Sequence, residues 1–106
     1  MKAGIWGNAI AAYDQIMAVT NGRNALVLNN LAFAQSQVGN KQKALGYAER
    51  AIKAAPADPS VMDTLGWLLI ETGGDKARAL QLLKTAAAKA PQNETIRRHL
   101  AEAQKG

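Results

Sequence analysis

The chain contains no cysteine, few aromatic side chains and only three prolines in 106 residues. Without cysteine it can form neither a disulfide nor a cysteine-based metal site. No apolar run approaches the roughly 18 residues of a membrane-spanning helix, so we expect no direct membrane insertion of this segment. What the chain does have is abundant alanine and a 48% share of hydrophobic residues. This composition favours one small, all-helical domain.

The charge excess is modest, because 13 basic and 8 acidic residues give a net charge of +5. The basic residues are spread along the chain and form no block; they include Lys41, Lys43, Arg50, Lys53, Lys76, Arg78, Lys84 and Lys89. Such spacing is typical of solvated helix faces, so we expect no nucleic-acid partner. An anionic polymer held on a basic face stays an alternative, and a steep salt dependence of binding would be its mark.

The sequence repeats itself with a period of 34 or 35 residues. Leu31 and Leu65 lie 34 residues apart. Phe33 and Trp67 keep the same separation. A third copy begins at Glu94, so the chain is an array of similar units. Later matching residues are 35 apart, which places one inserted residue in an expected turn. These pairs are Ala44 with Ala79, Ala51 with Ala86, and Pro56 with Pro91.

Start and stop signals divide the chain into six antiparallel helices. Asp58 followed by Pro59 is typical of a helix start, and Gly39 is typical of the position after a helix end. No segment has the sustained alternation of a strand. Further N-caps are expected at Asn40, Asp75 and Asn93. The expected helices lie near 4–20, 24–38, 41–55, 59–72, 75–90 and 93–104.

The pattern resembles the tetratricopeptide repeat, in which small residues recur in both helices of each unit and a proline follows the second. Small side chains at matched positions let neighbouring helices approach closely; they are Ala32, Ala44 and Ala51, then Gly66, Ala79 and Ala86. The resemblance implies a single all-α helical solenoid over residues 1–106. Its expected parts are a half repeat (4–21), two full repeats (25–58 and 59–93) and a terminal capping helix (94–105).

In that family the first helix of each repeat lines a concave groove, so the resemblance implies that positions off the core stripe face a ligand. Successive helix residues are rotated by about 100°, which puts Met62, Leu65 and Leu69 on one core stripe. Phe33 and Trp67 lie off that stripe at matched positions, and we predict that they anchor a partner segment. The alternative, that both only pack against a neighbouring helix, stays open. The predicted groove is Asn29, Phe33, Gln37, Asp63, Trp67, Ile70 and Arg98.

Residues able to support chemistry are sparse, and we predict that the protein is not an enzyme. His99 is the only histidine, so it lacks the cysteine or second histidine that a metal site would use. The glycines form no phosphate-binding loop. Asp63 and Glu71 lie eight residues apart on one expected helix, where both carboxylates are expected to be solvated. We therefore expect no cofactor, no metal and a non-catalytic scaffold that binds a protein or peptide segment.

A narrower resemblance rests on Asp63–Leu69, with Asn29–Ala32 before it and Glu94–Leu100 after it. These segments are similar to the C-terminal repeats of bacterial tetratricopeptide lipoproteins of exopolysaccharide export and PEP-CTERM/exosortase protein sorting. The likeness implies a periplasmic scaffold associated with the outer membrane; without it, the cytoplasm is the expected compartment. The segment Met1–Trp6 lacks the apolar run of a signal peptide, so any signal or lipid anchor is expected upstream.

An alternative function is structural, as a self-associating repeat fragment of a larger envelope assembly. The helix expected over 4–20 has no helix before it to pack against. We therefore predict that this end exposes apolar surface and can form a homodimer. The expected patch is Ile5, Trp6, Ile10, Tyr13 and Met17.

One branch of the tetratricopeptide family clamps the C-terminal carboxylate of chaperones with lysine, asparagine and arginine side chains. The resemblance does not extend to that clamp, because none of the matching positions carries the residue type that the clamp uses at that position. These positions are Asn29, Phe33, Thr64, Thr95 and His99.

Overall fold

A computed structural model describes residues 24–105, and all regular secondary structure in this range is helical. The prediction of an all-α array is confirmed for this part of the chain. The helix expected over 4–20, and the self-association predicted through it, lie outside the described residues. Between residues 24 and 105 no helix is long and apolar enough to cross a membrane. The five helices are α2 (Ala25–Gln37), α3 (Lys41–Ala54), α4 (Pro59–Glu71), α5 (Lys76–Lys89) and α6 (Glu94–Lys105).

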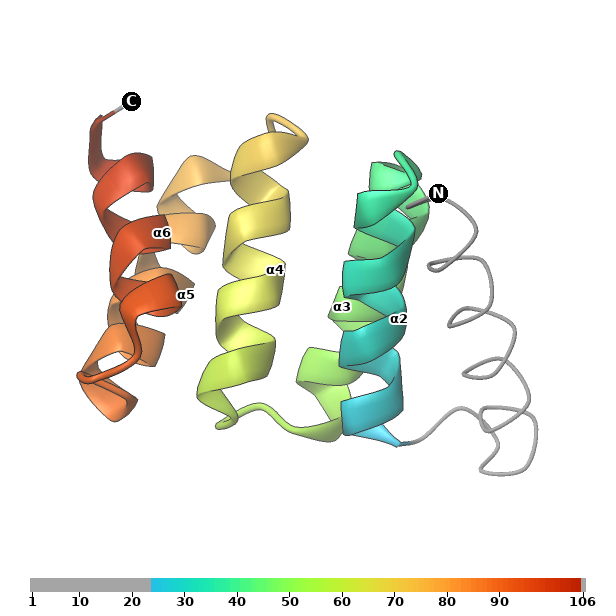
Figure 1. The fold of residues 1–106 in the computed structure, drawn as a ribbon, viewed down its shortest axis with the longest axis horizontal. Helices are drawn as coiled ribbons and strands as arrows, with labels where there is room; N and C mark the ends of the chain where they lie inside the picture. The colour runs from blue at the N-terminus through green and yellow to red at the C-terminus, as the bar shows by residue number, and fades with distance from the viewer. Residues whose placement is uncertain (1–23, 106) are drawn as a thin grey trace.

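The helices form two layers, which Figure 1 shows with the long axis of the molecule horizontal. We call α2, α4 and α6 the front layer and α3 and α5 the rear layer. The chain runs in one direction through the front layer and returns through the rear layer, so consecutive helices are antiparallel (Figure 1). Within the front layer α4 contacts both α2 and α6. This arrangement lines up side chains that recur with the period of the sequence.

Small residues set the spacing between the layers. Leu65 is fully buried, and the next residue, Gly66, faces α5. A Cβ at Gly66 would lie 2.9 Å from Leu83 Cγ and 3.2 Å from the carbonyl oxygen of Ala79. Since real Cβ atoms essentially never approach closer than 3.0 Å, this position has room for glycine only. The close helix approach predicted from the small residues is confirmed here.

The helix ends follow local signals in the sequence. Asp58 Oδ1 accepts a hydrogen bond from the backbone N–H of Ser60 at 2.8 Å, next to a proline in the first turn of α4. Asp75 caps α5 in the same manner through the N–H of Arg78. Gly39 and Gly73 follow α2 and α4 with φ of 90° and 71°, a conformation that favours glycine.

Asn40 departs from the prediction at the start of α3. It occupies the N-cap position, but its side chain makes no capping hydrogen bond. Its Nδ2 instead donates to Oε1 of Gln35 at 2.9 Å. Gln35 is buried on α2, and a buried amide without a partner would cost free energy. The side chain of Asn40 therefore serves the contact between α2 and α3.

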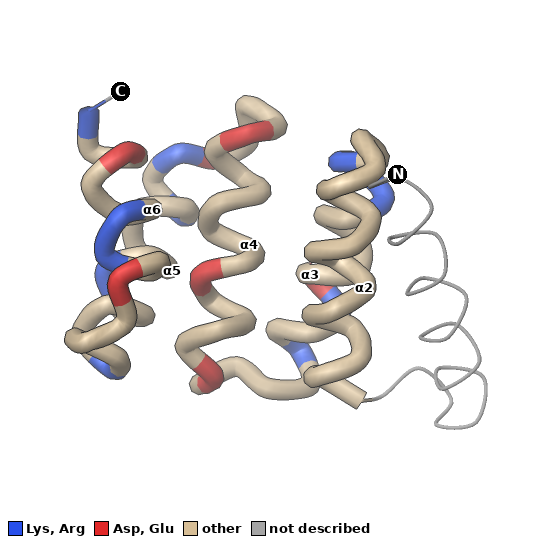
Figure 2. Tube along the Cα trace, in the orientation of Figure 1, with Lys and Arg blue, Asp and Glu red and all other residues tan. Residues whose placement is uncertain are grey.

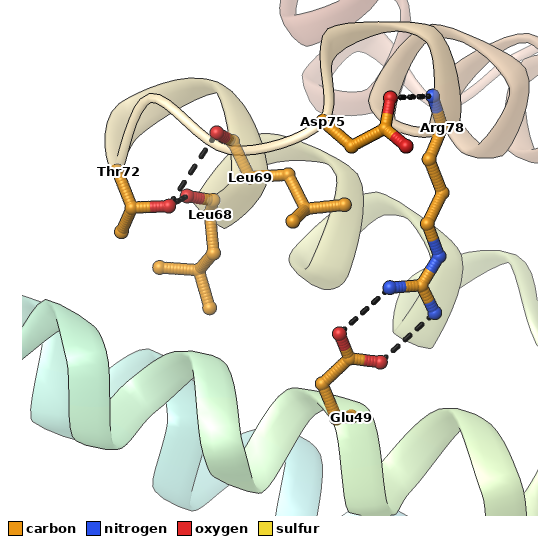
Figure 3. Close-up of polar contacts among 6 residues, drawn as sticks. All are labelled: Glu49, Leu68, Leu69, Thr72, Asp75 and Arg78. Carbon is orange, nitrogen blue, oxygen red and sulfur yellow. Dashed lines mark hydrogen bonds and ion pairs between the residues drawn. The ribbon is translucent and has the colours of Figure 1, made fainter.

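A bidentate ion pair connects the two rear helices (Figure 3). Arg78 on α5 donates to both carboxylate oxygens of Glu49 on α3, at 2.7 and 2.9 Å. This hydrogen bond, opposed in part by burial, lowers the pKa of the Glu49 carboxyl below its ordinary value. In the same view Thr72 Oγ1 donates to the carbonyl oxygen of Leu68 at 2.8 Å, at the end of α4.

Candidate functional site

A cavity of about 220 Å³ lies where α4 meets its two front-layer neighbours. Most of its lining is apolar, and neither lysine nor arginine is among the lining residues. The lining side chains come from all three front helices: Phe33, Ser36 and Gln37 of α2; Asp63, Thr64, Trp67 and Leu68 of α4; Thr95 and His99 of α6. We call this cavity the front pocket.

Two aromatic residues, one from α2 and one from α4, line the front pocket. Phe33 on α2 is 51% exposed, and only Leu26 is a more exposed large apolar side chain among the described residues. Trp67, at the matching position on α4, is half-buried. Its ring stacks on the imidazole of His99, with ring centroids 4.3 Å apart and an angle of 11° between the planes. One face of the indole is therefore used within the chain, while Trp67 still lines the pocket.

A polar pair connects α4 with α6 at the side of the pocket. Asp63 is buried, and its Oδ1 lies 2.8 Å from Nδ1 of His99. A carboxylate can only accept a hydrogen bond, so Nδ1 carries the proton and donates it to Asp63. The other ring nitrogen, Nε2, is then the one left for a ligand, and no residue of the described range bonds to it. The pair orients the imidazole on the face of Trp67.

The described residues contain no group of three histidine, aspartate, glutamate or cysteine side chains that could hold a metal ion. Asp63 and His99 alone would supply two ligands, and they bond to one another instead. The front pocket is thus built for contact with an apolar group and for hydrogen bonding.

The structure brings together four of the seven residues in the predicted groove: Phe33, Gln37, Asp63 and Trp67. The other three lie apart from the front pocket. Ile70 lines a separate depression with Leu69 and Lys76, while Arg98 lines another with Glu94 and Arg97.

Asn29 is the third of these residues. Its Oδ1 is buried and accepts no hydrogen bond from the described residues. Asn29 therefore contributes a buried polar atom to the front layer without lining the front pocket.

Sequence reasoning did not identify His99 as a pocket residue. It matched Arg98 to Asp63, because Arg98 precedes Leu100 by the same distance as Asp63 precedes Leu65. Each front helix, however, turns one face to the helix before it and another to the helix after it. Asp63 lies on the face of α4 that is turned to the following helix, α6. It therefore meets the face of α6 that is turned back to α4, where His99 lies. The available signal was the 35-residue separation of Thr64 and His99, which both line the pocket.

Comparisons with a protein-family model and with solved structures agree with the helical repeat fold described above. A family model described as tetratricopeptide repeat matches residues 10–105. The TPR domain of Sgt2 from Aspergillus fumigatus is similar with a TM-score of 0.84 at 22% identity, over 96% of this chain and 68% of that chain. The second TPR domain of human RPAP3, solved in complex with the HSP70 peptide SGPTIEEVD, has a TM-score of 0.81 at 23% identity, over 97% and 84% of the two chains.

A third similar structure is PcrH in complex with the chaperone binding region of PopD. Its TM-score is 0.73 at 17% identity, over 97% of this chain and 76% of that chain. At these identities the likeness shows the fold alone. No curated protein sequence matches this chain, so the narrower resemblance to envelope lipoproteins stays a prediction.

Proposed function

The chain belongs to the tetratricopeptide-repeat family, and on that premise we propose that it binds a segment of a partner protein in the front pocket without catalysing a reaction. The observation that carries the proposal is that Phe33, 51% exposed, and Trp67 both line one cavity of about 220 Å³. Solvent-exposed aromatic surface is costly to leave in water, and aromatic residues are enriched among binding hot spots.

The pocket is large enough for one side chain but smaller than a typical pocket for a drug-sized ligand. A cavity of about 150 Å³ holds a benzene molecule, whereas pockets for drug-sized ligands start at about 300 Å³. A volume of about 220 Å³ therefore matches one large side chain of a partner segment. The remaining residues of that segment would lie along the front layer.

The scaffold supports such binding because its pocket walls are already in place. All nine lining residues belong to helices, so little backbone ordering accompanies binding. Two of the similar structures, the RPAP3 domain and PcrH, contain a peptide or a segment of another protein, by their descriptions. They support the proposal by analogy of fold.

A structural role for the repeats is the alternative expected from the sequence. It predicts stacking on further repeats and no effect of the front pocket on binding. The two functions separate cleanly, because only a binding function requires Trp67 and Phe33 to be accessible to another molecule.

A peptide selection tests the proposed function. The whole chain would be immobilised and used to select from a phage-displayed library of random dodecapeptides. The proposal expects enriched peptides that bind the parent chain and lose at least about tenfold in affinity for Trp67→Ala, the loss typical of an interface anchor. Helicity measured by circular dichroism should be unchanged. Enriched peptides that bind Trp67→Ala and the parent equally would contradict the proposal.

A further inference from the structure

Charge is divided unequally between the two layers of the described chain. α2 carries no charged side chain, and α4 carries only the carboxylates Asp63 and Glu71. Figure 2 shows this division, with no charged band on α2 and red bands alone on α4. α6 carries charges of both signs. The rear helices hold eight cations, namely Lys41, Lys43, Arg50 and Lys53 on α3 and Lys76, Arg78, Lys84 and Lys89 on α5. The net charge of +5 therefore says little about the front pocket.

Inside the pocket the only charged groups are Asp63 and, when protonated, His99. Glu71, the other carboxylate on α4, is 3.3 Å from Lys41 and does not line the pocket. A neutral His99 leaves the pocket with the negative charge of Asp63. A protonated His99 is balanced by Asp63, so in neither state does the pocket carry a net positive charge.

The hydrogen-bonding groups of the front pocket also favour a ligand that is cationic and donates hydrogen bonds. Asp63 accepts a hydrogen bond from the Nδ1–H group of His99, which leaves Nε2 of the neutral ring as an acceptor. The second carboxylate oxygen of Asp63 is a further acceptor. A ligand group that donates hydrogen bonds would be satisfied here, whereas a carboxylate would lie beside another carboxylate.

Resting on the proposed function, we infer that the partner segment places a lysine or arginine side chain in the front pocket. The aliphatic stem of such a residue packs on the apolar walls formed by Phe33 and Trp67, as basic side chains do on apolar surfaces. Its cationic head lies towards Asp63 and His99 and donates to their acceptors. The front pocket thus selects a basic residue and disfavours a C-terminal carboxylate.

The test uses synthetic copies of the dodecapeptides that depend on Trp67. Each lysine or arginine would be replaced in turn by glutamine, which removes the charge and leaves the protein itself unaltered. The inference expects one basic residue whose loss weakens binding by about tenfold or more, as for a charge-assisted hydrogen bond. Replacement of that residue by glutamate should weaken binding further.

Two protein variants assign the effect to Asp63. Asp63→Asn removes the charge but keeps an oxygen that can accept from His99, and Glu71→Gln removes the other α4 carboxylate as a matched control. The effect of the peptide's basic residue should largely disappear in Asp63→Asn and persist in Glu71→Gln. Trp67-dependent peptides that need no basic residue, or that bind better with glutamate, would overturn the inference while the proposed function stands. A library without any Trp67-dependent peptide would overturn both.

Discussion

Asp63 and His99 are joined across the front layer by a hydrogen bond of 2.8 Å, although they lie 36 residues apart in the chain. The equivalent positions one repeat earlier are Asn29 and Thr64. Those two residues form no such pair, because Thr64 Oγ1 donates to the carbonyl oxygen of Ser60 in its own helix. This accounts for the buried Oδ1 of Asn29, which has no donor among residues 24–105. The polar side of the front pocket is therefore particular to the interface of α4 with α6.

Removing the imidazole should leave a buried carboxylate without its partner. We expect His99→Phe, which keeps an aromatic ring for Trp67 to stack on, to lower the free energy of unfolding by about 1–3 kcal/mol. Urea unfolding followed by circular dichroism measures the change. The double variant Asp63→Leu/His99→Phe should recover part of the loss, because neither polar group is then left unpaired. An unchanged unfolding midpoint for His99→Phe would show that the pair contributes nothing to stability.

Two glycines on helices should respond in opposite directions to the same substitution. Gly46 on α3 has open space around an added Cβ, so Gly46→Ala should stabilise the chain by about 0.5–1 kcal/mol through helix propensity. Gly66→Ala brings the same propensity gain but forces its methyl group against Leu83 and Ala79. We expect a net loss of about 1 kcal/mol or more from this overpacking. Thermal unfolding of both variants measures the difference. A melting temperature of Gly66→Ala as high as that of Gly46→Ala would contradict the close packing at Gly66.

The Glu49–Arg78 ion pair should make a small, pH-dependent contribution to stability. The folded-state pKa of Glu49 is lowered, so this contribution is present above the unfolded-state pKa and is lost as the pH falls through the folded value. Both side chains are more than a third exposed, so solvent screens the interaction. We expect Glu49→Gln to cost less than about 1 kcal/mol at neutral pH and low salt.

This difference between Glu49→Gln and the parent chain should shrink as the pH falls below the ordinary pKa of glutamate, about 4.3, and should vanish in stronger acid, where the carboxyl of the folded chain is protonated as well. Urea midpoints measured for both proteins at neutral pH and in acid test the sign. A difference that persists unchanged in acid would mean that the contact is not electrostatic.

The helices were predictable from the sequence because their boundaries depend on local interactions. A predicted helix near 59–72 corresponds to α4 (Pro59–Glu71), since Asp58, Pro59 and Gly73 act on the backbone next to them. Asn40 shows the limit of this reasoning. The same residue type can cap its own helix or bond to a buried group of another helix, and tertiary packing decided in favour of Gln35.

The pocket was only partly predictable, again for a physical reason. Periodicity places Phe33 and Trp67 at matched positions, and both line the front pocket. It does not give the rotation of α6 about its own axis relative to α4. That rotation turns His99 towards Asp63 and leaves Arg98 in a separate depression with Glu94. A shift of one residue along a helix rotates the side chain by about 100°, which is enough to move it from one face of the helix to another.

The most direct test of pocket binding compares two exposed apolar residues on α2. Phe33 lines the front pocket, while Leu26, 68% exposed on the same helix, does not. Isothermal titration calorimetry would give the affinity of a Trp67-dependent dodecapeptide for the parent, Phe33→Ala and Leu26→Ala. Our account predicts that Phe33→Ala weakens binding by about tenfold or more and that Leu26→Ala leaves it within about twofold of the parent. Equal affinities for all three proteins, or a larger loss for Leu26→Ala, would contradict it.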